Sequence, residues 1–355
     1  MKTVSEMTGL PVDAAMRELW LQIPRMALLV VMACSALFGA PRPVMAADPA
    51  SATGRPADRA LGGPAPANGQ GRYALTHGGI ERHYLVRLPA SAPPAGQRWP
   101  VVLVLHGGGG DGPITEKTTG FTPRGQREGF VVVYPEGTGR FANHLLTWNA
   151  GHCCGQAMQR RVDDVGFMSA LIDKLLADYP IDPKRVYVTG ISNGGMMAHR
   201  VGRELPEKVA AIATVVAGLF GDEKPPAVGV SALMINGGLD VSVPVAGGAP
   251  GGRFAEAWDG TRLLPATGQA AFWAAANRCA GEPEVTRQDV VQRTRYRCPA
   301  GREVELIVLA DHPHGWPGGV AGSRLGATPS RSLDASDEIW AFFKRQHASS
   351  PADRP

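Results

Sequence analysis

One serine lies in a sequence context that suits nucleophilic chemistry. Ser192 is the centre of "GISNG", residues 190–194, which has the pattern G-x-S-x-G. The apolar run "RVYVTG" before it is typical of a buried strand, and a helical pattern runs from Ser192 to Glu204. A serine at a sharp strand-to-helix turn presents its hydroxyl above the sheet. The pattern therefore predicts a nucleophile at Ser192, in preference to a serine that only caps a helix in a glycine-rich turn.

A serine hydroxyl is a weak nucleophile, so it needs a general base and an acid that orients the base. On a sheet of this kind the expected chain order is serine, acid, histidine. Asp240 follows the buried strand "LMING" and is the predicted acid, with Asp163 or Asp164 as replacements. His312 and His314 both follow the strand "EVELIVLA", and their spacing alone does not choose the base between them.

Two groups of backbone N–H donors are placed to stabilise an oxyanion. Asn193 opens the helix after the serine, where N–H groups lack intrahelical partners. The run "HGGGG", residues 106–110, follows another strand, and its glycines let the backbone approach a substrate oxygen. We expect Asn193 and Gly108 to be the donors; the alternative for the glycine run is a flexible turn. Trp148 and Trp316 lie beside these motifs and are expected to wall an apolar substrate pocket, with a place in the core as the alternative.

The elements around these residues alternate between strands and helices. A hairpin is expected over residues 72–89, and "PVVLVL", "FVVVY" and "RVYVTG" are short apolar runs typical of strands buried on both faces. Helical spacing of apolar residues covers 164–179, 192–204, 269–277 and 334–346. This alternation predicts an α/β fold with a mainly parallel sheet and helices on both of its faces.

The N-terminus carries the features of an export signal. A basic residue precedes an apolar stretch at 26–40, which is shorter than a membrane span, and "VMA" at 44–46 is a typical small-residue cleavage site. We expect residues 1–46 to be removed, which makes the mature protein secreted, extracellular or periplasmic, without a membrane anchor. The alternatives are an uncleaved interfacial anchor, acylation at Cys34 and a translation start at Met16.

The rest of the chain is expected to hold one folded domain. Residues 47–70 are rich in Ala, Pro and Gly and read as a linker, residues 71–348 as the catalytic domain and residues 349–355 as a tail. A hydrophobic content of 44% allows a sizeable core. The formal net charge of +4 is too mild to predict a nucleic-acid partner.

Four cysteines remain after removal of the signal. Cys279 ends a helical pattern and Cys298 ends a strand, so a disulfide between them is the expected pairing in an exported protein. Cys153 and Cys154 are neighbours, and a bridge across a trans peptide would be strained, so free thiols compete with it. Together with His152 they lack the ligand spacing of a metal site, and no metal is expected.

Six ordered motifs together resemble those of one family. They are "LHGGGGDG", "TWNAGHCCG", "VDDVGF", "GISNGGMM", "NGGLDVSVP" and "HGWPGG", and the resemblance as a whole spans about Arg72 to Gln346. This set is similar to the polyhydroxybutyrate depolymerase family of esterases, which includes feruloyl and acetylxylan esterases. The chain departs from that family's pattern at Asn236-Gly237 and in the segment 310–313 before the base.

The resemblance implies an α/β-hydrolase fold with a Ser-Asp-His triad and no cofactor. Family members carry a His-x-Trp-Pro-Gly segment whose histidine is the base, which here selects His314 over His312. The implied activity is hydrolysis of a small ester or oligoester through an acyl-enzyme on Ser192. A feruloyl or acetylxylan esterase is the alternative. An exported binding protein on a hydrolase fold is a further alternative, against which the intact triad argues.

Overall fold

The computed structural model describes residues 71–348 except 142–143, 253–254 and 323–325. All of them belong to one compact unit, residues 59–355, while a second unit, residues 1–58, lies outside the described part. The expected signal, linker and tail lie outside it as well. Within the described ranges no helix is long and apolar enough to cross a membrane.

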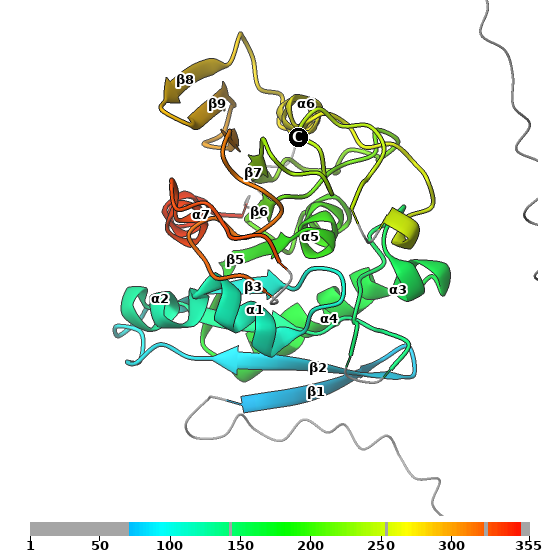
Figure 1. The fold of residues 1–355 in the computed structure, drawn as a ribbon. Coiled ribbons are helices and arrows are strands. Elements are labelled where there is room, and N and C mark those ends of the chain that lie inside the picture. Colours follow the sequence, from blue (N-terminus) through cyan, green and yellow to red (C-terminus); the bar gives the residue numbers. More distant parts are fainter. Residues whose placement is uncertain (1–70, 142–143, 253–254, 323–325, 349–355) are drawn as a thin grey trace, which may run out of the picture. The chain divides into compact units, whose positions relative to one another are not determined.

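The described residues form one ten-stranded sheet with helices packed on it (Figure 1). The strands are β1 (Gly71–His77), β2 (Ile80–Arg87), β3 (Trp99–Leu105), β4 (Val131–Pro135), β5 (Ile181–Ile191), β6 (Ala211–Val215), β7 (Ser231–Gly237), β8 (Glu284–Gln288), β9 (Val291–Arg297) and β10 (Glu303–Leu309). The helices are α1 (Gly112–Thr119), α2 (Phe121–Glu128), α3 (Gly155–Gln159), α4 (Asp164–Asp178), α5 (Asn193–Glu204), α6 (Ala266–Ala276) and α7 (Ala335–Phe343), with a short 3₁₀ turn η1 (Ala255–Ala257).

The sheet has a parallel centre and antiparallel edges. Its order is β1-β2-β4-β3-β5-β6-β7-β10-β9-β8. The strands from β4 to β10 in this order pair in parallel, whereas the β1-β2 hairpin and the β9-β8 hairpin join antiparallel. The prediction of a mainly parallel sheet with an N-terminal hairpin is confirmed. Because parallel strands share a direction, the residues that follow β3, β5, β7 and β10 meet at one edge.

Two helical layers bury the two faces of the sheet. Every residue of β3 and β7 is buried, as expected of strands covered on both sides. Alternate side chains of β3 point to opposite faces: Leu103 packs with the layer of α4, α5 and α6, and Val104 with the layer of α2 and α7. Figure 1 shows α2 and α7 on one side of the sheet and α4, α5 and α6 on the other. The helices expected at 164–179, 192–204, 269–277 and 334–346 correspond to α4, α5, α6 and α7.

Candidate active site

Ser192 occupies the sharp turn between β5 and α5. Its backbone has φ +54° and ψ −124°, a positive φ that is uncommon outside glycine. The flanking glycines make room for the turn, because a Cβ at Gly190 would overlap the backbone of Gly194, and a Cβ at Gly194 would overlap the carbonyl oxygens of Leu105 and His106. The turn therefore needs glycine on both sides of the serine and presses α5 against the end of β3.

A chain of two hydrogen bonds joins the three predicted triad residues. His314 Nε2 lies 3.0 Å from Ser192 Oγ, and His314 Nδ1 lies 2.8 Å from Asp240 Oδ2. The Asp240 side chain is fully buried, and its Oδ1 accepts the backbone N–H groups of Ser242 (2.8 Å) and Val243 (2.9 Å). A carboxylate accepts only, so this pattern assigns the imidazole proton to Nδ1 and leaves Nε2 free to accept the Ser192 hydroxyl proton.

The glycine run after β3 lies beside the serine. Ideal Cβ atoms at Gly107 and Gly108 would approach the Cβ atoms of Ser192 (3.5 Å) and Asn193 (3.8 Å). The Gly107 carbonyl accepts from Gly110 N (3.0 Å) and contacts His106 Nδ1 (2.8 Å), while Gly109 N donates to Leu146 (2.8 Å). In a trans peptide the N–H and C=O point in opposite directions. The Gly108 N–H therefore points away from the groups that bind the Gly107 carbonyl. The Gly108 N–H donates no hydrogen bond to any residue that the structure describes.

The neutral ring of His106 holds the peptide between Gly107 and Gly108. Its Nε2 accepts the Gly137 N–H (2.9 Å), so its Nδ1 carries the proton and donates to the Gly107 carbonyl. Burial lowers the pKa of His106 to about 4, which keeps the ring neutral at ordinary pH. The N–H of Asn193 lies in the first turn of α5, where it has no carbonyl four residues earlier in the helix. Gly108 and Asn193 therefore remain the candidate N–H donors to an oxyanion.

Comparison with known proteins identifies the family. Residues 83–249 match the family described as "Esterase PHB depolymerase". The chain carries a domain of this esterase family over these residues. It is a carboxylic ester hydrolase, as the sequence motifs predict.

Curated relatives of this esterase carry related names. The putative esterase NocK of Nocardia uniformis subsp. tsuyamanensis is 28% identical over 75% of this chain and 80% of its own length. A poly(3-hydroxybutyrate) depolymerase of Ralstonia pickettii is 33% identical, over 35% of this chain and 26% of its own length. The bifunctional acetylxylan esterase/xylanase XynS20E of Neocallimastix patriciarum is 33% identical, over 38% of this chain and 18% of its own length. The match thus spans only about a quarter or less of the last two proteins.

Solved structures show the fold of the esterase. An acetyl xylan esterase from Aspergillus awamori superposes with a TM-score of 0.54 at 13% identity, covering 78% of this chain and 99% of that chain. The predicted α/β-hydrolase fold is therefore confirmed.

The other histidine of the base loop, His312, supports the esterase's site without contacting Ser192. His312 is fully buried; its Nδ1 accepts the Ser330 N–H (3.2 Å) and its Nε2 lies 3.0 Å from the Gly315 carbonyl. Burial lowers the pKa of His312 below its ordinary value. Asp311 accepts the hydroxyl groups of Ser330 and Ser332, both at 2.8 Å. These residues hold the loop that presents His314.

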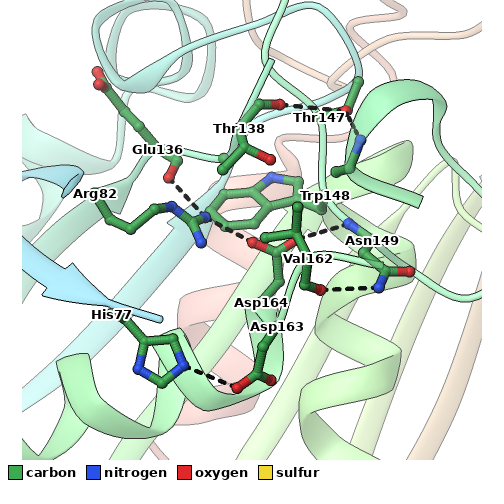
Figure 2. Close-up of polar contacts among 12 residues, drawn as sticks. His77, Arg82, Glu136, Thr138, Thr147, Trp148, Asn149, Val162, Asp163 and Asp164 are labelled. Atoms are coloured by element: carbon green, nitrogen blue, oxygen red, sulfur yellow. Dashed lines mark hydrogen bonds and ion pairs between the residues drawn. The ribbon is translucent and has the colours of Figure 1, made fainter. Parts of the chain in front are cut away.

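The two replacement acids lie elsewhere in the esterase. Asp164 is fully buried and pairs with Arg82 (2.7 Å), and Asp163 contacts His77 (2.9 Å) (Figure 2). Neither contacts His314, so of the three predicted acids it is Asp240 that lies within hydrogen-bonding distance of the ring.

The prediction that Trp148 and Trp316 wall a substrate pocket is wrong. Trp148 is 0% exposed and Trp316 is 2% exposed, so neither indole lines an open pocket. The Trp316 indole N–H donates to Ser336 (2.9 Å), and its ring packs edge-on against Phe121. Trp316 is a core residue between α7 and α2. The role of Trp148 is considered below.

The four cysteines in the described part of the chain form two disulfides. Cys279 is linked to Cys298, the expected pair. Cys153 is linked to Cys154 rather than carrying a free thiol. The sequence left this pair open between a strained bridge and free thiols, on the assumption of a trans peptide, whereas the peptide between them is cis.

The segment 246–267 of the esterase is tied to the body of the domain at several points. Leu264 N donates to the Leu219 carbonyl (2.7 Å), and Asp259 contacts His152 Nδ1 (2.6 Å). His152 Nε2 in turn contacts Asp222 (2.8 Å). The described part of this segment is thus anchored to the loops at 152 and 219–222.

Proposed function

We propose that this esterase works through an acyl-enzyme on Ser192. The observation that carries the proposal is the hydrogen-bond chain from Ser192 Oγ through His314 to the buried Asp240. A nucleophile, a base and an orienting acid in this order form the constellation used for acyl transfer.

In the first half of the reaction, Ser192 Oγ attacks the ester carbonyl carbon while His314 Nε2 takes the hydroxyl proton. The negative charge develops on the carbonyl oxygen, where the backbone N–H groups of Asn193 and Gly108 stabilise it. Losing one such donor costs on the order of 100- to 1,000-fold in rate. The bond to the alcohol then breaks, and His314 returns the proton to the leaving alkoxide.

In the second half, water attacks the acyl group on Ser192. His314 takes a proton from that water, and the tetrahedral intermediate collapses to release the acid and restore the Ser192 hydroxyl. Asp240 keeps the imidazole in its Nδ1–H tautomer and stabilises the positive charge that His314 carries twice in each cycle.

We propose a small ester or oligoester as the substrate, with a hydroxybutyrate oligomer first and a feruloyl or acetylated polysaccharide second. Relatives named for each of these activities match part of this chain. Three large apolar side chains lie exposed on the loops that carry the site: Leu145 (63%), Leu239 (59%) and Val241 (71%). Leu145 lies next to Gly109, and the other two flank Asp240. Apolar side chains at these positions suit an apolar acyl or alcohol group.

We also propose that the esterase is exported after removal of residues 1–46, with 47–70 as a linker to the catalytic domain at 71–348. Disulfides persist in oxidising compartments, and the two disulfides support this location. Amino-terminal sequencing of the exported protein tests it: Ala47 is the expected first residue, and an intact signal would contradict it.

A panel of hydroxybutyrate oligomers, methyl ferulate, acetylated xylan and p-nitrophenyl esters tests the activity and the substrate class. Wild type should hydrolyse p-nitrophenyl butyrate and Ser192→Ala should not. Ser169→Ala on helix α4 is the matched control and should keep wild-type rates. Equal turnover by wild type and Ser192→Ala would overturn the proposed mechanism. The oligomer or polymer cleaved with the highest kcat/KM identifies the substrate class.

A further inference from the structure

Trp148 contacts both halves of the proposed oxyanion site. Its backbone N–H donates to Asn193 Oδ1 (2.8 Å), and Asn193 Nδ2 donates back to the Trp148 carbonyl (3.0 Å). Its indole N–H donates to the His106 carbonyl (3.1 Å), and its ring lies 4.9 Å from the His106 ring. One residue therefore binds the first residue of α5 and the residue that opens the glycine run.

These contacts are made next to the two peptides that carry the donors. The Asn193 side chain belongs to the residue whose own N–H faces the oxyanion. The His106 carbonyl belongs to the peptide between His106 and Gly107. The next peptide, between Gly107 and Gly108, carries the Gly108 N–H, and the His106 ring holds it through the Gly107 carbonyl. Asn193 is 1% exposed and Trp148 is 0% exposed, so water does not replace these bonds. Trp148 thus links the residue that opens α5 to the residue that opens the glycine run.

A buried ion pair supports Trp148 from the other side (Figure 2). Arg82 donates to Asp164 Oδ1 (2.7 Å) and to the Glu136 carbonyl (3.1 Å), and its guanidinium lies 5.7 Å from the Trp148 ring centre. Asp164 Oδ2 accepts the N–H of Asn149, the next residue after Trp148, at 2.7 Å. The Asn149 side chain donates to the Val162 carbonyl (2.9 Å). The segment that carries Trp148 is therefore held by hydrogen bonds on both of its sides.

We propose that Trp148 and the Asn193 side chain are positioning residues that fix the two oxyanion donors, Gly108 N–H and Asn193 N–H, at the spacing needed for catalysis. This inference rests on the proposed function, because it assigns a role within the same site. Neither side chain touches the substrate. Removing their bonds leaves both donor N–H groups present but no longer held, and a displacement of about 1 Å in such a site costs on the order of 100-fold in rate.

The first test is Asn193→Ala, which keeps the backbone N–H and removes both bonds to Trp148. Rates on p-nitrophenyl butyrate are expressed per active site, titrated with a p-nitrophenyl phosphonate. We expect kcat to fall about 10- to 100-fold with KM within about twofold. The Ki of phenylboronic acid, whose adduct on Ser192 places an oxygen between the donors, should rise by a similar factor. The midpoint of the pH profile of kcat/KM should not move, since His314 and Asp240 are unchanged.

Asn277→Ala is the matched control. Asn277 is also fully buried, and its side chain makes two hydrogen bonds, to the carbonyls of Val230 (2.8 Å) and Trp273 (2.9 Å), at the end of α6. It should lower the melting temperature while kcat per titrated site and the boronic acid Ki stay at wild-type values.

Trp148→Phe is the second variant, and it keeps a ring in the same space while removing the bond to His106. It should lower kcat and weaken boronic acid binding in the same direction, which also covers the case in which Asn193→Ala does not fold. Unchanged kcat and Ki per titrated site in the folded variants would overturn the inference. A lower rate that is fully explained by a smaller number of titratable active sites would overturn it as well. Failure of the proposed function is distinguishable, because Ser192→Ala would then be as active as wild type.

Discussion

The backbone carbonyl of His312 accepts a hydrogen bond from the backbone N–H of Leu239, with 3.0 Å between the two atoms. Leu239 precedes Asp240, and His312 lies two residues before His314. This bond joins the loop of the acid to the loop of the base. His312 also contacts Ser330 and Gly315 through its ring, so its position supports the distance between Asp240 and His314 without placing it in the reaction.

The two histidines of this loop should therefore respond differently to alanine. His314→Ala removes the base, and we expect kcat to fall by on the order of 10,000-fold or more while the fold stays intact. His312→Ala leaves buried groups without partners, so we expect a loss of about 1–3 kcal/mol in the free energy of unfolding and a smaller loss of kcat. Urea unfolding and rates on p-nitrophenyl butyrate measure both. The reverse ranking of activities would assign the base to His312.

Asp240→Asn should keep the volume of the side chain but place the imidazole proton on the wrong nitrogen. An amide N–H facing His314 Nδ1 favours the tautomer with the proton on Nε2, which no longer accepts the Ser192 proton. We expect kcat to fall by on the order of 10,000-fold with little change in KM. Asp163→Asn, at the exposed partner of His77, is the control and should keep wild-type kcat. Comparable losses in both variants would contradict the assignment of Asp240.

Acid should destabilise the domain in part through His199. Burial lowers the pKa of His199 to about 3, and its Nδ1 accepts the Trp273 indole N–H (3.0 Å). The unfolded chain binds a proton below pH 6.5 and the native state does not, so stability present above that pH is lost as the pH falls toward 3. The loss from this group is on the order of 2 kcal/mol between about pH 6.5 and pH 5.

The comparison with His199→Asn isolates this contribution, because Asn keeps an acceptor for Trp273 but does not titrate. Urea midpoints of wild type should fall more steeply between about pH 7 and pH 5 than those of the variant. The other buried histidines are common to both proteins and cancel. Parallel pH dependences would show that His199 does not contribute.

The disulfide between Cys279 and Cys298 should stabilise the end of α6 and the β8-β9 hairpin. It closes a loop with a sequence separation of 19 residues, for which the loss of chain entropy in the unfolded state corresponds to about 3 kcal/mol. The double variant Cys279→Ala/Cys298→Ala should unfold at a lower denaturant concentration and keep wild-type kcat below that transition. Peptide mapping without reduction should recover these two cysteines linked, and a Cys154–Cys279 peptide would contradict the pairing.

The sequence allowed the site loops to be located because each follows a strand that is buried on both faces. Such strands have long apolar runs, and the polar residue after each run must lie at the edge where the parallel strands end. This position, together with the G-x-S-x-G pattern, favoured Ser192 as the nucleophile. It also favoured Asp240 as the acid, with Asp163 and Asp164 as alternatives, whereas the base stayed ambiguous between His312 and His314. That choice depends on which ring reaches Ser192, which spacing along one loop does not determine.

Other elements escaped the sequence analysis for physical reasons. Helices α1 and α2 carry few apolar residues, although the cap at Asp111 and the glycines at 120 and 129 mark their ends. Strand β8 is exposed along its whole length and so has no apolar alternation. Trp148 was expected in the substrate pocket because it lies beside a motif, but its contacts to Asn193, His106 and Arg82 come from three distant parts of the chain.

Direct detection of the acyl group on Ser192 tests the central claim. The esterase is mixed with p-nitrophenyl butyrate, quenched in acid within the first turnover and mapped by peptide mass spectrometry. We predict a burst of p-nitrophenol close to one per active site and a butyryl group on the peptide that contains Ser192, both absent in Ser192→Ala. A butyryl group on another residue, or full turnover by Ser192→Ala, would contradict the mechanism.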